Sequence, residues 1–285
     1  MTDVSGSHAI VTGGSSGIGH ATARLLARKG ARVSIVARDP TRLDTARADI
    51  LGSVPGATVQ CAVADVTDPV AVEAALRALG EQSGPCDVLV NAAGSAHPGY
   101  FDKLSLGVFR DQMEVNYFGT LHAVRAVLPA MIRQRRGHIV AISSTAGLFG
   151  VFGYAAYAPS KFAVRGLAET LRPELVPYGI VVACAYPPDT RTPGLDRENA
   201  LKPPETVSVS GRIQPRSADD VAVAIVRGIE RDRLMITMDF QTAALARAAD
   251  VFGPYARRTM DRTIRRVRGT FQSPEGRSRE GGWRE

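Results

Sequence analysis

Tyr157 and Lys161, four residues apart, are the side chains of this sequence best suited to move a proton. Residues at this spacing on a helix share one face, so the Lys161 ammonium is predicted to lie beside the Tyr157 phenol and to lower its pKa from about 10 toward neutrality. A phenol tuned in this way exchanges a proton with a substrate oxygen. Ser144, at the expected end of a strand, is predicted to reach the same oxygen, and Asn116 is a fourth candidate. Each residue alone has an ordinary structural role as a cap or in packing, so the prediction depends on a nearby nucleotide site.

A glycine-rich stretch, Thr12 to Gly19 (TGGSSGIG), indicates such a site. Gly13, Gly17 and Gly19 follow an apolar run and open a helical pattern, where glycine lets backbone amides approach a pyrophosphate at the positive end of a helix. The spacing is G-x-x-x-G-x-G, and glycines alone also mark ordinary turns. The position of the glycine stretch before five further strand and helix units favours a dinucleotide-binding site.

The choice of dinucleotide depends on Arg38. Where NAD binders carry Asp or Glu, about twenty residues beyond the glycines, this chain has Ala37 followed by Arg38. A guanidinium there can hold a ribose 2′-phosphate in bidentate fashion, so NADPH is predicted over NADH. The alternative is that Arg38 merely ends a strand in water. Asp65, after the third strand, is predicted to meet the adenine.

The predicted cofactor-binding residues all lie at the carboxyl ends of the strands or in the loops that follow them. They are Gly13, Ser15, Ser16, Gly17, Ile18, Gly19, Arg38, Asp65, Val66, Asn91, Ala92, Gly94, Tyr157, Lys161, Pro187, Thr190 and Thr192. No metal site is expected, because the three cysteines lie far apart and no histidine neighbours them at metal-ligand spacing.

Short β-branched runs alternate with longer patterns rich in Ala, Leu and Arg. The predicted strands are His8 to Val11, Arg32 to Ala37, Ala57 to Val63, Asp87 to Val90, His138 to Ser143 and Ile180 to Ala185, with a helix at Ser217 to Arg231 and an edge strand at Leu234 to Thr237. Strand then helix, repeated, predicts a parallel sheet covered on both faces. We expect an α/β, doubly wound (Rossmann) fold, with one domain over residues 1–238.

Two segments depart from this alternation. Residues 187–215 are rich in Pro, Thr and charge and follow the sixth strand, so they are predicted to form a lid over the substrate. Residues 239–285 are predicted to be a helical, basic extension with a disordered end beyond Gln272. Within it, Met260, Ile264, Val267 and Phe271 recur at helical spacing opposite several arginines.

Charge and composition exclude several classes of protein. The formal net charge is +7, and from Arg247 onward ten arginines face five acids, so +5 of it lies in the extension. The other basic residues are scattered and no nucleic-acid-binding motif is present, so no nucleic-acid partner is expected. No apolar run approaches the length of a membrane span, and the first strand begins too early for a signal peptide. A cytoplasmic protein is expected.

The glycine stretch, Asn91-Ala92-Ala93-Gly94, Asn116, Ser144 and Tyr157-x-x-x-Lys161 together resemble the short-chain dehydrogenase/reductase superfamily, over Ser7 to about Thr237. The resemblance implies hydride transfer to a ketone, with Tyr157 as general acid and Lys161 lowering its pKa and binding the nicotinamide ribose. It also implies that Ser144 polarises the carbonyl and that Asn116 holds a water in a proton relay. Pairing through the helices of Asn116 and Tyr157 would give a homodimer or homotetramer.

A finer resemblance lies in the stretch that begins at Tyr186, YPPDTRTPG, with Glu198-Asn199 and Lys202-Pro203 after it. These residues are similar to the 3-ketodihydrosphingosine reductases, which reduce a long-chain 3-keto base with NADPH. That family typically has Asp where this chain has Arg191, which puts the substrate in question but not the reaction.

Three functions are compatible with the sequence. The first is NADPH-dependent reduction of a long-chain, lipid-type ketone such as 3-ketosphinganine. The second is oxidation or reduction of another secondary alcohol or ketone, such as a 3-oxoacyl or steroid-like compound, and the third is nucleotide binding without turnover. If the substrate is a lipid, the C-terminal helix is a candidate for peripheral membrane contact. The alternative is that the apolar stripe of this helix packs on the sheet or on another subunit.

Overall fold

The computed structural model describes residues 1–210, 214–239, 242–243, 259, 261–264 and 266. Its main sheet has seven parallel strands in the order β3-β2-β1-β4-β5-β6-β9. The strands are β1 (His8–Thr12), β2 (Arg32–Ala37), β3 (Val59–Val63), β4 (Val88–Asn91), β5 (Gly137–Ile142), β6 (Ile180–Ala185) and β9 (Met235–Ile236). Central strands such as β1 are buried on both faces, which explains their continuous apolar sequences. The predicted doubly wound fold is confirmed.

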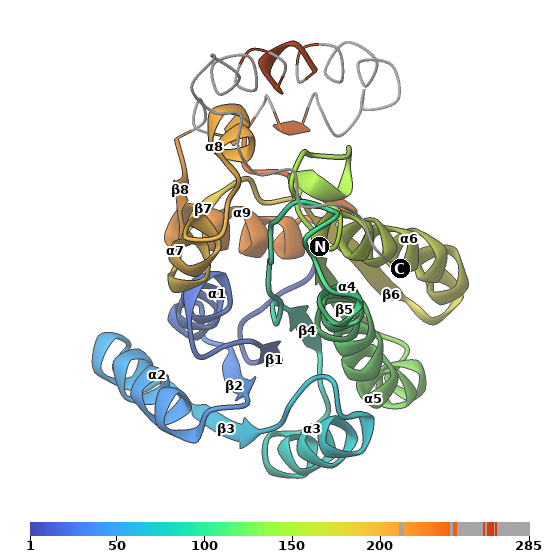
Figure 1. Cartoon of the computed structure of the whole chain (residues 1–285). Helices are drawn as coiled ribbons and strands as arrows, with labels where there is room; N and C mark the ends of the chain where they lie inside the picture. The colour runs from blue at the N-terminus through green and yellow to red at the C-terminus, as the bar shows by residue number, and fades with distance from the viewer. Residues whose placement is uncertain (211–213, 240–241, 244–258, 260, 265, 267–285) are drawn as a thin grey trace.

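Helices cover both faces of this sheet (Figure 1). One face carries α1 (Gly17–Arg28), α2 (Pro40–Ser53) and α9 (Ala218–Glu230), whose apolar residues pack in one core cluster with β1 and β2. The other carries α3 (Pro69–Ser83), α5 (Gly119–Gln134) and α6 (Tyr157–Leu175), while α4 (Leu106–Met113) packs against α6. The chain winds outward from β1 to β3 and then returns to β4. The β1/β4 boundary is therefore the switch point at which such folds bind ligands.

The starts of the helices differ in a way that bears on ligand binding. Asp39 caps α2 by accepting from the Arg42 backbone N–H, and Asp68 caps α3 in the same manner. Ser16 precedes α1, but its side chain makes no capping hydrogen bond. The first turn of α1 begins at the switch point, and the Ser16 side chain accepts no hydrogen bond from its backbone N–H groups.

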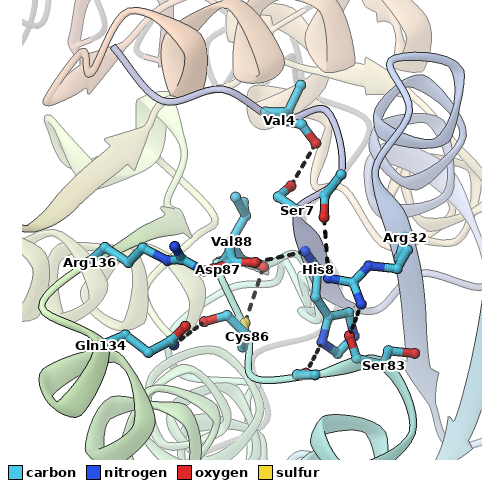
Figure 2. Close-up of polar contacts among 12 residues, drawn as sticks. Val4, Ser7, His8, Arg32, Ser83, Cys86, Asp87, Val88, Gln134 and Arg136 are labelled. Atoms are coloured by element: carbon cyan, nitrogen blue, oxygen red, sulfur yellow. Dashed lines mark hydrogen bonds and ion pairs between the residues drawn. The ribbon is translucent and has the colours of Figure 1, made fainter.

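At the amino end of the sheet, polar side chains bind one another (Figure 2). His8 is fully buried, with its Nδ1 2.6 Å from the Gly84 carbonyl oxygen and its Nε2 2.8 Å from the Ser34 hydroxyl. The Asp87 carboxylate accepts from the His8 backbone N–H at 3.0 Å and from Arg136 Nε at 3.1 Å. These contacts tie the first residues of β1 to the segment that enters β4.

Between β6 and α9 the chain forms secondary structure that the sequence analysis did not assign. It forms β7 (Thr190–Arg191), α7 (Pro193–Asn199), α8 (Pro204–Ser210) and β8 (Arg216–Ser217), and β7 pairs with β8 in a small second sheet. Thr192 caps α7 by accepting from the Leu195 backbone N–H, and Pro193 occupies its first turn. The segment predicted to be a lid thus contains two helices and a small sheet, and its role as a lid stays a prediction.

Most of the C-terminal extension, including Met260, Val267 and Phe271 of the predicted stripe, lies outside the described residues. Within the described part of the chain, no helix is both long and apolar enough to cross a bilayer.

Candidate active site

A cavity of about 1110 Å³ opens at the carboxyl ends of the strands, at the switch point. Every predicted cofactor-binding residue except Asn91 lines it, and so do Ser144, Tyr157 and Lys161. Residues 187–192 and parts of α7 form the opposite wall. Segments that are far apart in the sequence thus meet around one space.

The glycine turn fits a cradle for a pyrophosphate. Gly13 has a φ of +68°, and a Cβ there would lie 2.6 Å from the Ala93 backbone nitrogen. A Cβ on Gly19 would lie 2.4 Å from the Gly13 carbonyl oxygen. Glycine is therefore required for the turn to pack against the end of β4, and the start of α1 then faces the cavity. These residues fit the phosphate groups of a dinucleotide.

Arg38 lies at the edge of the same cavity, just beyond β2. Its side chain is 71% exposed, and its NH1 is 3.4 Å from Asp65 Oδ2. The Asp65 carboxylate also accepts from the Thr67 hydroxyl and backbone N–H, and these hydrogen bonds outweigh burial and hold its pKa below the usual value. Arg42, one turn into α2, lines the cavity too. Two guanidinium groups thus border the region next to the glycine turn.

Tyr157 begins α6, and Ser144 lies two residues after β5. Both line the cavity, and a hydrogen bond joins the Ser144 side chain to the Tyr157 phenol. The Ser144 hydroxyl also accepts from the Ala146 backbone N–H at 3.1 Å, which fixes its position. The predicted convergence of a strand end and the following helix is therefore present.

Lys161 lies one turn after Tyr157, with its Nζ 5.7 Å from the centre of the tyrosine ring. Nζ donates to the Ile142 carbonyl oxygen at 3.0 Å, and burial lowers the pKa of Lys161 to about 8. Burial raises the pKa of Tyr157, and the Ser144 hydrogen bond only partly opposes this effect. Desolvation is the largest influence on the Tyr157 pKa in this structure, and a lowering of that pKa by the Lys161 ammonium stays a prediction.

Asn116 and Asn91 lie behind the cavity wall rather than in it. Asn116 is fully buried within a π-helical turn, Glu114–Phe118, and its amide nitrogen donates to the Ser95 carbonyl oxygen and the Ser160 hydroxyl. A Cβ on Gly94 would lie 2.8 Å from Asn116 Oδ1 and 3.3 Å from Lys161 Nζ, so these groups meet around Gly94. The water relay through Asn116 stays a prediction.

Asn91 ends β4 and is also buried, away from the cavity lining, so its part in cofactor binding stays a prediction. Its Nδ2 donates to the Val140 carbonyl oxygen at 3.4 Å, and its Oδ1 has no hydrogen-bond partner among the described residues. The side chain braces β4 against β5 beneath the site.

The sequence analysis did not single out a group of charged residues in the cavity wall. Tyr154 donates from its hydroxyl to Glu198 Oε1, and Lys202 Nζ lies between Glu198 and Asp189. Tyr154, Asp189 and Glu198 line the cavity. Glu198 and Lys202 are four residues apart, but they lie in the segment predicted to be a lid, to which no helix was assigned.

A proton-donating tyrosine beside a cradle for two phosphates defines a nicotinamide-dependent oxidoreductase. The family described as short chain dehydrogenase matches residues 7–202, which is more than half of the chain. The chain belongs to this family, whose chemistry is the interconversion of a ketone and a secondary alcohol.

Two curated proteins have sequences similar to that of this chain. The chain is 43% identical over 227 residues to the 3-dehydrosphinganine reductase of Danio rerio, covering 79% of this chain and 68% of the relative. It is 41% identical over 258 residues to the 3-ketodihydrosphingosine reductase of Dictyostelium discoideum, covering 85% and 77%.

Solved structures share the fold. An actinorhodin polyketide ketoreductase variant with NADPH has a TM-score of 0.75 at 30% identity, covering 83% of this chain and 96% of its own. A short-chain dehydrogenase from Burkholderia phymatum in complex with NAD has a TM-score of 0.78 at 28% identity, covering 87% and 94%. Because these neighbours include complexes with both dinucleotides, the fold alone does not select one.

Proposed function

We propose that this protein reduces 3-ketosphinganine to sphinganine with NADPH. The observation that carries the proposal is that one cavity joins the Tyr157 phenol and the Ser144 hydroxyl to the glycine turn. The names of the two relatives supply the substrate, because both describe reduction of this long-chain ketone.

The preference for NADPH rests on charge at the cavity edge. Arg38 and Arg42 border the cavity beside the glycine turn, where a 2′-phosphate would meet them. Asp65 also lies there, paired with Arg38, and would repel an added phosphate if it stood alone. The guanidinium groups therefore support NADPH, and Arg38 is the residue on which the choice depends.

NADPH, when bound, supplies the hydride. Tyr157 donates the proton to the ketone oxygen, and Ser144 holds the same oxygen through a hydrogen bond. Burial raises the Tyr157 pKa, so the phenol holds its proton at neutral pH, and donation to the ketone requires that this pKa fall toward the working pH, the role proposed for the Lys161 ammonium. Lys161, fixed by the Ile142 carbonyl oxygen, is proposed to bind the nicotinamide ribose.

Residues 187–215 are proposed to act as the lid over the substrate, since much of the cavity wall comes from them. We also propose that the protein assembles as a homodimer or homotetramer. Residues 239–285 are proposed to make peripheral membrane contact. Flotation with anionic vesicles, compared between the full chain and a chain lacking residues 254–285, tests the membrane contact.

The test of the proposed function is consumption of NADPH by the purified full chain with 3-ketosphinganine. NADH and a 3-oxoacyl thioester are the controls for cofactor and substrate. We expect turnover with NADPH and the sphingoid ketone. A preference for the thioester, or no turnover with either compound, would remove the sphingolipid assignment.

A further inference from the structure

The cavity wall opposite the glycine turn contains an ion cluster with an excess of negative charge. Lys202 Nζ lies 3.2 Å from Asp189 Oδ2 and 3.3 Å from Glu198 Oε1, and its side chain is only 4% exposed. Two carboxylates thus share one ammonium. If all three groups are ionised, the cluster carries one uncompensated negative charge at the cavity surface.

The carboxylates have acceptor atoms to spare. Both contacts of Glu198, from the Tyr154 hydroxyl and from Lys202, fall on Oε1. No described residue donates to Glu198 Oε2 or to Asp189 Oδ1, and both residues line the cavity. A carboxylate that is largely buried gains much from a second cationic partner.

The ion cluster also lies close to the reacting atoms. The ring of Tyr154, which holds Glu198, lies 5.7 Å from the ring of Tyr157 between centres. The charges of Glu198 and Asp189 both contribute to raising the pKa of Tyr157. A cation bound by these carboxylates would therefore lie near the oxygen that Tyr157 protonates.

We propose that Glu198, assisted by Asp189, binds the ammonium group on the carbon adjacent to the ketone of the substrate. This inference rests on the proposed function, because 3-ketosphinganine carries an amine at that carbon. The amine is protonated at neutral pH, and its entry brings the ion cluster to two positive and two negative charges. Glu198 and Asp189 are then specificity determinants, which select an amino ketone over a simple ketone.

The rest of the wall fits the other end of such a substrate. Apolar side chains from the lid and from the loop after β5 line the cavity: Phe149, Val151, Leu195 and Val209. These residues suit an alkyl chain, whereas the carboxylates suit the charged end. The two ends of the substrate would thus be oriented by opposite kinds of surface, with the ketone fixed between them at Tyr157.

Lys202 has a positioning role in this arrangement. Its buried ammonium holds the two carboxylates about one point and leaves Glu198 Oε2 and Asp189 Oδ1 for the substrate. The Tyr154 hydroxyl fixes the Glu198 carboxylate by donating to the same oxygen, Oε1. Neither group needs to contact the substrate to place Glu198.

The experiment compares kcat/KM of wild type and Glu198→Gln for three ketones of equal chain length, with NADPH saturating. They are 3-ketosphinganine, its analogue without the amine, and its N-acetyl derivative, which lacks the charge. Asp196→Asn is the matched control, since Asp196 is an exposed acid of the same helix, α7, that does not line the cavity. Thermal unfolding and NADPH affinity of each variant show whether the fold is retained.

We expect wild type to prefer the amino ketone by about tenfold to a hundredfold, the usual value of a hydrogen bond to a charged group. Glu198→Gln should lose that preference, because its kcat/KM should fall about tenfold to a hundredfold further with the amino ketone than with the other two ketones. Asp196→Asn should match wild type. If Glu198→Gln fails to fold, Asp189→Asn, at the more exposed end of the ion cluster, should reduce the same preference.

Other results would overturn the inference. Equal loss with all three ketones, or no loss with the amino ketone, would show that Glu198 is only structural. Wild type that reduces all three ketones equally well would also overturn it, although the reductase proposal would stand. Wild type that reduces none of them would remove the proposed function itself.

Discussion

The two ends of the parallel sheet place polar side chains in opposite situations. At the amino end, the Asp87 carboxylate accepts from the His8 backbone N–H and from Arg136 (Figure 2). The two nitrogens of the His8 ring lie at hydrogen-bond distance from the Gly84 carbonyl oxygen and the Ser34 hydroxyl. These polar atoms therefore have their partners within the fold. At the carboxyl end, Ser144, Tyr157 and Glu198 face a cavity. Polar side chains thus serve the fold at one end of the sheet and, as proposed, the reaction at the other.

This difference separates stability from activity. Removing a partner at the amino end leaves a buried group without a hydrogen bond, which costs folding free energy. Removing a cavity-facing group such as the Tyr157 hydroxyl is expected to cost the fold less and the reaction more, because its proposed partner is the substrate. Substitutions at the two ends should therefore give opposite results in unfolding and kinetic measurements.

The largest effect is expected for Tyr157→Phe. The ring and its packing against Tyr154 remain, but the proton donor is lost, so kcat with the ketone substrate should fall by about a hundredfold to ten-thousandfold. NADPH binding and the unfolding midpoint should be close to those of wild type. Turnover at the wild-type rate would instead support a nucleotide-binding protein without this catalytic centre.

Arg38→Ala should have the next largest effect, at the cofactor end of the cavity. Loss of a charge-assisted contact to a 2′-phosphate should raise KM for NADPH by about tenfold to a hundredfold. KM for NADH, which has no such phosphate, should change little. The NADPH preference is wrong if both Michaelis constants are unaffected.

At the amino end, Asp87→Asn should lower the free energy of unfolding by about 1–3 kcal/mol. The amide cannot accept from both the His8 backbone N–H and the Arg136 guanidinium without turning its own N–H groups toward one of them. Denaturant unfolding measures the loss. A reduced kcat/KM in folded protein, with unchanged stability, would contradict the division between the two ends.

A further effect at the amino end is a pH dependence of stability that arises from His138, buried at the start of β5. Burial lowers its pKa to about 4, against 6.5 in the unfolded chain, so the unfolded state binds the proton first. The contribution of neutral His138 to stability is therefore fully present above pH 6.5. The free energy of unfolding falls by about 1.4 kcal/mol per pH unit as the pH drops from there toward 4. The pKa of buried His8 is lowered too, which adds to the same trend.

His138→Gln should flatten this acid slope in unfolding experiments, while kcat/KM at neutral pH stays unchanged. An unaltered slope would assign the acid sensitivity to other groups.

Much of the fold was predictable because buried parallel strands have continuous apolar sequences. The predicted second and sixth strands match β2 and β6 residue for residue, and the others differ by one or two residues at their ends. The four-residue spacing of Tyr157 and Lys161 placed both on one face of α6 near the cavity, as the helix period requires. The pattern could not report burial, which decided the direction of the Tyr157 pKa shift.

The segment after β6 shows where sequence patterns were insufficient. Helices α7 and α8 have seven residues each, too few to display a helical period. Thr192 followed by Pro193 is nonetheless a recognised helix start, and it was the available signal. The π-helical turn around Asn116 has no such signal; it joins α4 to α5 and packs against α6.

The uncapped start of α1 has a consequence for how much of this protein exists folded in a cell. Because Ser16 leaves that helix end for an anion, a dinucleotide contributes folding free energy that the chain does not supply. By mass action, ligand at one hundred times its dissociation constant adds about 2.7 kcal/mol. The abundance of the protein would then follow the nucleotide supply, since the unliganded fraction is the part exposed to unfolding and proteolysis.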